Sequence, residues 1–328
     1  MGNWSEITFP RADVFISVHR PDQASAQVTR LLDLLFGHPF RTPTRDEFAM
    51  FHARASALRS ADLGRQVGAA IVRPEGEVIA VGTNEVPKAG GGQYWAEDDL
   101  DRRDFQLGTN ESLRIRRSML AELLVRLKDD GWLDAVIATD VDENVDLQVT
   151  RLLPRMKGTT MMSVGEFGRT VHAEMAALLD AARRGVAVDG CTLFSTTFPC
   201  HNCTKHIAAA GIRRVVYIEP YPKSRAADLH DDAIVVDPGG SAGDKVSFEP
   251  FVGVAPRRYT DVFAMPVREN ADGSVRRFVK VEAIPRVSMT SAYVEAEEVA
   301  ILELYERLAE ADLSPTPDAG RRRNAPGR

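Results

Sequence analysis

The sequence has little of several features that would assign a protein to a common class. Only three of its 328 residues are cysteines, and no apolar run approaches the roughly 20 residues that cross a membrane. The N-terminus lacks the basic and then apolar pattern of a signal peptide. A net charge of −6 argues against a dedicated duplex-binding protein, and an aromatic content of 7% weakens the case for a groove that binds single strands. These absences favour a cytoplasmic protein, away from membranes, that acts on a small or single-stranded substrate.

The three cysteines are Cys191, Cys200 and Cys203. An odd, low count with two cysteines close together indicates a reducing compartment and a metal or redox role, rather than a disulfide framework. Cys191 falls on a predicted buried strand, so we expect it to be an inert core residue.

Strands alternate with helices along much of the chain, which predicts an α/β sandwich with some parallel pairing. Strands are predicted at 12–18, 190–196, 213–220 and 277–284, with a hairpin at 66–84. Helices are predicted at 22–37, 45–60, 111–131, 172–184, 200–211, 224–233 and 291–311. The mixed, charged block from about 85 to 165 is interpreted as an insertion, in which 138–146 is predicted to be a loop.

Two predicted helices begin with side chains that can hold a metal. His172 and Glu174 stand two residues apart at the start of one, and Cys200 and Cys203 stand three apart at the start of the other. Residues three apart on a helix lie on the same side, so the two sulfurs point the same way. With His172 they make a three-ligand zinc site with one open position, which is typical of catalytic zinc.

Two other uses of these residues stay open at this point. Cys200 and Cys203 could form a redox pair, although that leaves Glu174 without a role. They could also form half of a structural zinc finger, with His201 or His206 as a fourth ligand. The order of His-Ala-Glu, a strand and Pro-Cys-x-x-Cys favours the catalytic site.

Several segments within about residues 46–235 resemble the zinc-dependent cytidine and deoxycytidylate deaminase superfamily, in the family's order. They are RQVGAAIV, VGTN, VHAEMAAL, TTFPCHNC and GIRRVVYIEPYPKS. The first and last are more similar to the deoxycytidylate branch than to the free-nucleoside branch. The flanks HPFRTPTRDEFAMFHARASALRSADL, NEVPKAGGGQYW and PFVGVAPRRYTDVF resemble the bacterial antiviral dCTP deaminases.

The resemblance implies a three-layer α/β/α cytidine-deaminase-like sandwich with a helical insertion and a C-terminal extension. The implied parts are an N-terminal strand–helix extension (1–44), the deaminase domain (45–260, insertion about 85–165), a C-terminal extension (261–312) and a disordered tail (313–328). Members of the dCTP group often carry an N-terminal kinase-like domain, of which residues 1–44 could be a remnant. The sequence has no Gly-x-x-x-x-Gly-Lys-Ser/Thr phosphate loop.

The resemblance also implies hydrolytic deamination with Zn²⁺ as the cofactor. Zinc on His172, Cys200 and Cys203 would lower the pKa of a bound water from 15.7 to about 7, and the resulting hydroxide would attack C4 of cytosine. Glu174 would take the water's proton, protonate N3 and help ammonia to leave. Ala173 lies between the zinc ligand His172 and the proton carrier Glu174, and it would leave room for the cytosine base.

Each residue that we expect to contact the substrate also has another possible role. Asn84 matches a position that contacts the sugar, but it also suits a turn. Arg65 and Lys88 are either phosphate contacts or solvated surface charges. Phe198 and Tyr217 would wall the base pocket, unless Tyr217 belongs to the core. The glycines of KAGGGQYW could bind a phosphate through backbone N–H groups, form a lid or serve as a linker.

We therefore expect deamination of a free deoxycytidine nucleotide, with dCTP to dUTP favoured over dCMP to dUMP, in nucleotide depletion during antiviral defence. The alternatives are a cytidine or adenosine deaminase of single-stranded DNA or RNA, and a catalytically silent module that keeps the zinc fold. The superfamily also implies a homo-oligomer. The apolar faces of predicted helices 111–131 and 291–311 could serve as its interfaces or pack within the chain.

Overall fold

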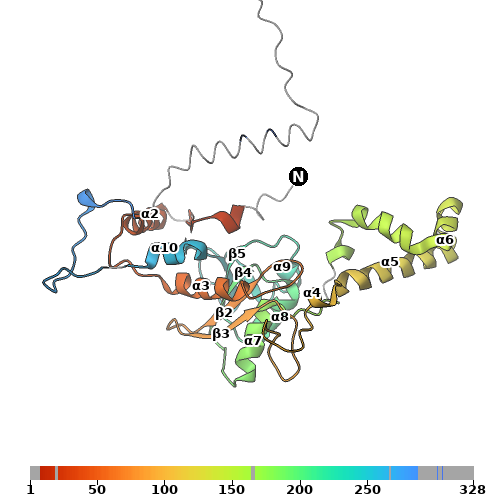
Figure 1. The fold of residues 1–328 in the computed structure, drawn as a ribbon, viewed down its shortest axis with the longest axis horizontal. Helices are drawn as coiled ribbons and strands as arrows, with labels where there is room; N and C mark the ends of the chain where they lie inside the picture. Colours follow the sequence, from red (N-terminus) through yellow and green to blue (C-terminus); the bar gives the residue numbers. More distant parts are fainter. Residues whose placement is uncertain are drawn as a thin grey trace, which may run out of the picture. The chain divides into compact units, whose positions relative to one another are not determined.

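The computed structural model describes residues 8–18, 21–163, 167–265 and 267–286, together with Ile301 and Tyr305. The chain divides into two compact units, residues 1–31 with 41–264, and residues 32–40 with 265–328 (Figure 1). No helix in the described part of the chain has the length and apolar character needed to cross a membrane.

The first unit is built on a six-stranded mixed sheet with the strand order β3-β2-β4-β5-β7-β6. Its strands are β2 (Gly68–Val72), β3 (Val78–Thr83), β4 (Thr192–Thr197), β5 (Arg214–Glu219), β6 (Ile234–Val236) and β7 (Val246–Pro250). Strand β2 pairs antiparallel with β3 and with β4, and the remaining pairs are parallel. The predicted hairpin and the predicted parallel pairing are both present.

Helices cover both faces of this sheet (Figure 1). Helix α3 (Arg45–Ala57) packs on one face, and α7 (Ala173–Arg183) and α8 (His201–Ala209) pack on the other. Successive strand residues alternate between the two hydrophobic clusters, with Ala69, Leu193 and Val215 beneath α7 and α8, and Ala70, Phe194 and Val216 beneath α3. Strands buried on both faces become nearly continuous apolar runs. The predicted three-layer α/β/α fold is confirmed.

Two glycines allow helices to lie directly on the strands. A Cβ atom on Gly82 of β3 would lie 2.1 Å from the carbonyl oxygen of Ala173 in the first turn of α7. A Cβ atom on Gly68 of β2 would lie 2.0 Å from the carbonyl oxygen of Ala53 in α3. Because side chains do not pack this closely, both positions require glycine. Gly82 thereby sets the position of α7, which begins directly after His172.

The segment between β3 and α7 contains the expected helical insertion. Its elements are α4 (Asp104–Leu107), α5 (Glu111–Asp129), α6 (Ala135–Leu152) and the 3₁₀ turns η2 (Leu153–Met156) and η3 (Thr160–Ser163). Helices α5 and α6 lie side by side (Figure 1), joined by an ion pair between Lys128 and Asp142. The predicted helix at 111–131 is therefore α5, half of a helical hairpin.

The prediction of a loop over 138–146 is wrong, because these residues belong to α6. The polar run does break the helix locally: Asn144 has φ −162° and ψ 88°. Its side chain accepts a hydrogen bond from the Leu147 N–H at 2.9 Å, as an N-cap residue does. Val141 and Val149 are buried on either side of the break, and tertiary packing of this kind provides most helix stability.

Several further elements complete the first unit. Strand β1 (Val14–Phe15) pairs antiparallel with β8 (Gly253–Val254), so the strand predicted at 12–18 has only two residues. Thr44 caps α3 in a capping box with Glu47. The helix predicted at 224–233 is reduced to the single turn α9 (Ala226–Leu229). The other elements are η1 (Phe9–Arg11), η4 (Pro256–Arg258) and α10 (Tyr259–Phe263). Helix α2 (Pro21–Leu35) belongs to the first unit up to residue 31 and to the second unit from residue 32.

In the second unit, the prediction of a strand over 277–284 is wrong. This stretch contains only the 3₁₀ turn η5 (Lys280–Glu282). Its apolar residues face solvent, with Val281 93% and Ile284 79% exposed. Among the residues that the structure describes, no strand pairs with this stretch. Apart from Ile301 and Tyr305, the helix predicted at 291–311 and the tail at 313–328 lie outside the described residues.

Candidate active site

The three predicted metal ligands meet where α7 and α8 begin. His172 is the N-cap residue of α7 and Cys200 that of α8, both with extended backbone, and Cys203 lies in the first turn of α8. The Nδ1 atom of His172 lies 3.4 Å from each sulfur. Neither N-cap side chain caps its helix, because the imidazole and the thiol face each other instead. The three donor atoms lie within 4.8 Å of one another.

These separations fit a zinc ion. In a tetrahedral site with Zn–S bonds of about 2.3 Å and Zn–N bonds of about 2.0–2.1 Å, adjacent nitrogen and sulfur donors lie about 3.5 Å apart. His201 and His206, the two candidates for a fourth ligand, are not part of the donor group found among the described residues. Three protein ligands leave one tetrahedral position open, which favours the catalytic interpretation over the structural finger.

The pKa values of the three ligands shift in different directions. The pKa of Cys200 is lowered to about 3, first by its hydrogen bond with the Cys203 thiol and then by His172. The hydrogen bond with Cys200 in turn raises the pKa of His172 to about 9. The pKa of Cys203 is raised, by its hydrogen bond with Cys200 and by burial. Cys200 is therefore a thiolate at neutral pH, which is the form that binds zinc.

Glu174 lies beside the three ligands but outside their donor group. It is in the first turn of α7 and only 4% exposed. Its Oε2 atom lies 3.5 Å from the sulfur of Cys203. Burial raises the pKa of the Glu174 carboxyl, since the charged form loses its hydration. A buried carboxyl at this place can exchange protons with a molecule at the open metal position.

A cavity of about 310 Å³ is lined by His172, Cys200 and Glu174 together. Four of the predicted substrate residues also line it, namely Arg65, Asn84, Ala173 and Phe198. This size lies at the lower end of the range for small-molecule sites. The structure therefore brings the metal group, the buried carboxyl and most of the predicted substrate residues to one cavity.

Asn84 and Arg65 belong to one local arrangement. The Asn84 side chain accepts a hydrogen bond from the Val67 N–H and donates one to the Arg65 carbonyl, both at 2.7 Å. Asn84 therefore holds the loop at 65–67 as well as lining the cavity. The Arg65 guanidinium lies 5.0 Å from the ring centre of Tyr221 and 3.8 Å from the Glu219 carboxylate.

Two predicted substrate residues do not reach this cavity. Lys88 pairs with Asp98 and lines a separate cavity of about 880 Å³. The reason is a tight turn, in which the Lys88 N–H donates to the Gly92 carbonyl at 3.0 Å. Tyr217 lies on β5 and packs edge-on against Phe198, with ring centres 4.9 Å apart. Tyr217 therefore belongs to the core, which was one of the two alternatives for it. Lys88 does not line the cavity of the metal ligands and lies on another surface.

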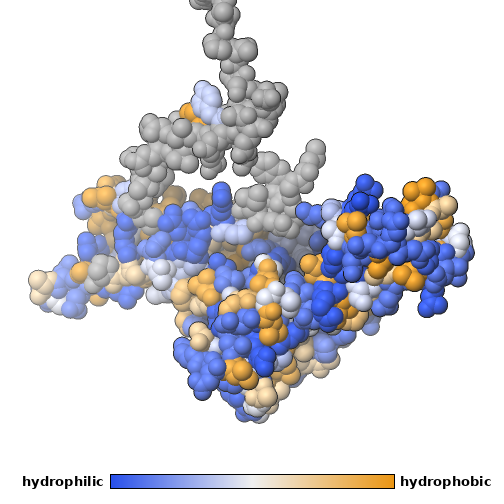
Figure 2. Space-filling model, turned by 45° about the vertical axis from the view of Figure 1, so that its right-hand side comes forward, coloured by the Kyte–Doolittle hydropathy of each residue, from blue (hydrophilic) through white to orange (hydrophobic). Residues whose placement is uncertain are grey.

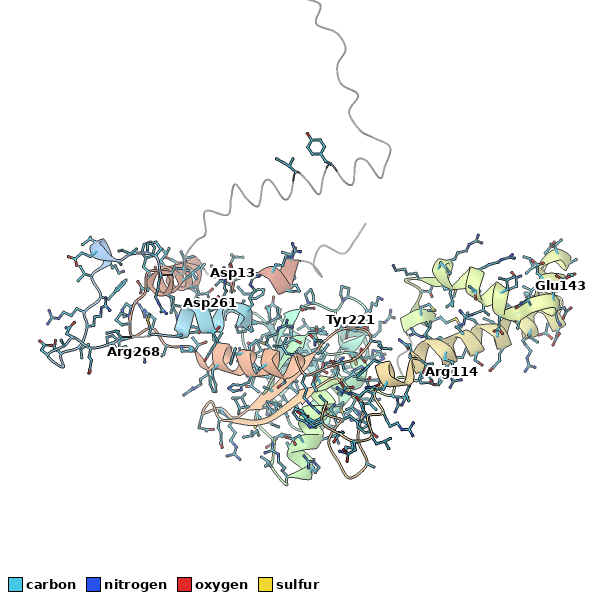
Figure 3. The ribbon with its side chains drawn as sticks, in the orientation of Figure 1. Asp13, Arg114, Glu143, Tyr221, Asp261 and Arg268 are labelled. Atoms are coloured by element: carbon cyan, nitrogen blue, oxygen red, sulfur yellow. The ribbon has the colours of Figure 1, made fainter. Side chains whose placement is uncertain are left out.

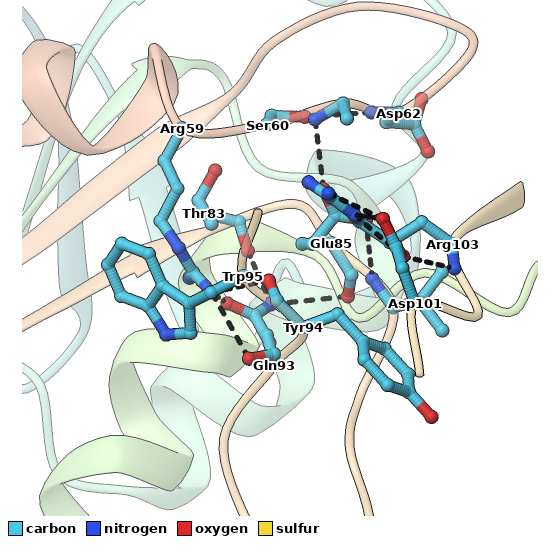
Figure 4. Close-up of polar contacts among 12 residues, drawn as sticks. Arg59, Ser60, Asp62, Thr83, Glu85, Gln93, Tyr94, Trp95, Asp101 and Arg103 are labelled. Carbon is cyan, nitrogen blue, oxygen red and sulfur yellow. Dashed lines mark hydrogen bonds and ion pairs between the residues drawn. The ribbon is translucent and has the colours of Figure 1, made fainter. Parts of the chain in front are cut away.

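The chain that leads into α7 is held by the end of β3. The Glu85 carboxylate accepts hydrogen bonds from the N–H groups of Ala61 and Val86, both at 2.9 Å (Figure 4). The backbone of Glu85 exchanges two hydrogen bonds with Val171, at 3.3 and 3.1 Å. Val171 directly precedes His172, so Glu85 connects the loop after α3 to the zinc ligand.

Sequence reasoning missed several residues that line the cavity. They include Asp62, Asp104, Asn110, Ser112, Arg116, Thr170 and Tyr221. Tyr221 stands within the family-like segment YIEPYPKS, which could have identified it. The residues from 104 to 116 belong to the insertion, and no sequence pattern indicates that they return to the site, because this depends on the path of α4 and α5.

An open three-ligand metal group with a buried carboxyl beside it defines a zinc-dependent hydrolase site. A family model described as "Cytidine and deoxycytidylate deaminase zinc-binding region" matches residues 43–219, which is more than half of the chain. The chain belongs to this family. The family and the donor group together confirm zinc as the cofactor.

Several deoxycytidylate deaminases are similar to parts of this chain. That of Enterobacteria phage T2 is 46% identical over 55 residues, which are 17% of this chain and 29% of the relative. The probable deoxycytidylate deaminase of Drosophila melanogaster is 26% identical over 196 residues, which are 58% of this chain and 70% of the relative. A solved structure that is similar to this chain is the crystal structure of dCMP deaminase from the cyanophage S-TIM5 in complex with dCMP and dUMP. The TM-score is 0.36 and the sequence identity 19%, and the match covers 64% of this chain and 98% of that chain.

Proposed function

We propose that this protein deaminates the cytosine of a free deoxycytidine nucleotide, replacing the 4-amino group by oxygen. The observation that supports this most is the buried Glu174 next to the three-ligand group in one cavity. The reaction consumes one water and releases one ammonia. The predicted roles of His172, Cys200 and Cys203 as ligands and of Glu174 as proton shuttle are part of this proposal.

In the proposed reaction, zinc supplies a nucleophile at neutral pH by lowering the pKa of water to about 7. Glu174 would take a proton from the water and deliver it to N3 of the ring. It would then take the proton of the new C4 hydroxyl group and give it to the amino group, so that ammonia leaves and the C4 carbonyl forms. Ala173 is fully buried beside Glu174, and its small side chain leaves space for the ring. Phe198 forms an apolar wall of the cavity.

The favoured substrate is dCTP, with dCMP next, and the proposed role is nucleotide depletion in antiviral defence. The support is the resemblance of the flanking segments to bacterial dCTP deaminases and the presence of Arg65 in the cavity. Lys88, which also suggested a long phosphate chain, no longer supports this choice because it lines a different cavity. The proposal includes a cytoplasmic location and a homo-oligomeric assembly.

Ammonia release and product chromatography test the proposal. The zinc-loaded protein is incubated with deoxycytidine, dCMP, dCTP, CTP and a cytosine-containing single-stranded oligonucleotide. We expect turnover of at least one free deoxynucleotide, dCTP first. Turnover of the oligonucleotide alone would support the nucleic-acid-editing alternative instead, and no turnover of any substrate would support the silent zinc module.

A further inference from the structure

We propose that Arg116, on helix α5 of the insertion, binds the 5′-phosphate chain of the nucleotide and sets which phosphorylation state the enzyme prefers. This inference rests on the proposed function, because it assigns a specificity residue to the same cavity. Arg116 lines that cavity together with Asp104, Asn110 and Ser112 from the same insertion. The insertion thus contributes one wall of the site, while α7 and α8 supply the metal ligands.

The guanidinium of Arg116 is held in place without being neutralised. Its Nε atom donates to the carbonyl of Ser112 at 3.1 Å, and its Nη1 atom donates to the carbonyl of Met162 at 2.5 Å. Among the residues that the structure describes, no carboxylate forms an ion pair with it. A guanidinium has five N–H groups, so Arg116 keeps donors for a ligand along with its full positive charge.

The other charged residues of the insertion wall and the neighbouring loop are paired. Asp104 forms an ion pair with Arg169 at 2.7 Å. Arg65 lies 3.8 Å from Glu219. Arg116 therefore carries the charge in this part of the lining that a bound anion would compensate.

The remaining carboxylate of the lining, Asp62, belongs to the metal end of the cavity. Its two oxygens accept hydrogen bonds from Gly64 N–H and from the Thr170 hydroxyl, both at 2.8 Å. Thr170 lies two residues before His172, so this hydrogen bond places Asp62 at the end of the cavity where the ligands lie. The lining thus has an acidic side at the zinc ligands and a cationic side at the insertion.

This polarity matches the chemistry of a nucleotide. The reacting C4 atom belongs at the metal, and the phosphates lie at the other end of the molecule. An arginine fork binds phosphate oxygens through two parallel hydrogen bonds, which gives both strength and orientation. Because its backbone contacts hold the side chain, Arg116 would lose little conformational freedom when it binds a phosphate.

The test compares Arg116→Gln and Arg116→Lys with the control Arg114→Gln. Arg114, labelled in Figure 3, lies on the same helix but pairs with Glu111 and does not line the cavity. For each zinc-loaded protein, kcat/KM is measured with deoxycytidine, dCMP and dCTP. Binding of the three products deoxyuridine, dUMP and dUTP is measured by calorimetry, and zinc content and Tm verify folding.

We expect Arg116→Gln to lower kcat/KM for the best nucleotide roughly 10- to 100-fold, mainly through KM, as for loss of a hydrogen bond to a charged group. The loss should grow with the number of phosphates and should leave deoxycytidine turnover and deoxyuridine binding within about twofold. Arg116→Lys should retain part of the preference, and Arg114→Gln should change nothing.

Two results would overturn the assignment: unchanged nucleotide kinetics and product binding in Arg116→Gln, or an equal loss for nucleoside and nucleotides. The second result would show that Arg116 only supports the fold around Met162. Failure of the proposed function itself is distinct, because the wild-type protein would then turn over no deoxycytidine compound. The binding series still reports on Arg116 in that case.

Discussion

In the proposed mechanism, two residues on one short stretch have different roles, His172 in metal binding and Glu174 in proton transfer. His172 is the extended N-cap of α7, which turns its imidazole toward the sulfurs of Cys200 and Cys203. Glu174 lies within the first helical turn and is buried beside Cys203 without joining the donor group. The change from extended to helical backbone after His172 thus separates a ligand from a neighbouring carboxyl.

Replacing Glu174 by Gln should abolish turnover while the metal stays bound. The amide keeps the volume of the buried side chain but cannot carry the proton, and proton transfer of this kind contributes about 10²–10⁴-fold to the rate. We expect kcat on the best nucleotide to fall at least 100-fold, with zinc content and Tm near those of the wild type. Activity within about tenfold of the wild type would reject the proton-shuttle role, and loss of zinc would make Glu174 part of the metal shell.

Replacing Cys200 by Ser should remove zinc and lower stability together. The three ligands connect the starts of α7 and α8, and metal binding to such a site adds directly to folding free energy. Elemental analysis should show clearly less than one zinc per chain, and the Tm should fall, as it should when a chelator is added to the wild type.

The third cysteine provides the control for that experiment. Cys191 is buried but outside the donor group, so Cys191→Ala should keep its zinc even if packing is weakened. A Cys200→Ser protein with a full zinc content would show that the ligand set is assigned incorrectly.

At the scale of elements, the site depends on how closely α7 lies on β3. Gly82 leaves no room for a Cβ beneath the first turn of α7. The backbone bridge between Glu85 and Val171 holds the residue just before His172. Strand β3 therefore sets the height of α7 over the sheet, and Glu85, two residues after the strand, holds the point at which the helix begins.

Replacing Gly82 by Ala should displace helix α7 and with it the metal ligand His172. The new methyl group would lie 2.1 Å from the Ala173 carbonyl and 2.4 Å from the Ala177 nitrogen, so α7 must move away from the sheet. Overpacking of this kind costs about 1–3 kcal/mol, and displacement of the ligand helix should reduce kcat by roughly 100-fold. Denaturant unfolding and kinetics of the zinc-loaded protein measure the two effects.

Gly240→Ala is the matched control, since the nearest atom outside its neighbours lies 4.0 Å from the added Cβ. It should leave stability and kcat nearly unchanged. Equal behaviour of the Gly82 and Gly240 variants would show that α7 is not held by close contact with β3.

At the scale of the whole molecule, the insertion hairpin exposes apolar surface. Trp132 is 79%, Val136 71% and Ile137 48% exposed around the connection between α5 and α6. Figure 2 shows hydrophobic side chains on this hairpin at the right of the view. Exposed apolar patches commonly mark interfaces between protein chains, so this surface is a candidate interface for the predicted self-association.

Light scattering at micromolar concentration should therefore report an assembly larger than the 36.1 kDa single chain. The double substitution Trp132→Glu and Val136→Glu should shift it toward the monomer, because charges are costly to bury in an interface. Val281→Glu, at a site 93% exposed in the second unit, should leave the assembly unchanged. A monomeric wild-type protein would contradict the prediction.

The features that the sequence determined by itself are those that depend on local spacing. The three-residue spacing of Cys200 and Cys203 puts both sulfurs on one side of α8, which helix geometry decides by itself. The motifs around His172 and Glu174 identify the other helix start, but the meeting of the two helix starts depends on how α7 and α8 pack. The layered core follows from apolar strands that alternate with helices. The local pattern was misleading in two places. Within the described part of the chain no strand pairs with 277–284, and 138–146 is helical because it packs as part of α6.

Only the tertiary structure decided which distant residues share the cavity. Lys88 looked like a phosphate contact from its neighbours, yet a tight turn directs it to another surface, whereas Arg116 reaches the site from a helix with no recognisable motif. The short strands β6 and β7, which extend the sheet beyond β5, were also not predicted. The physical reason is shared: these placements depend on contacts between residues far apart in the chain, and such contacts leave no periodic trace in the sequence.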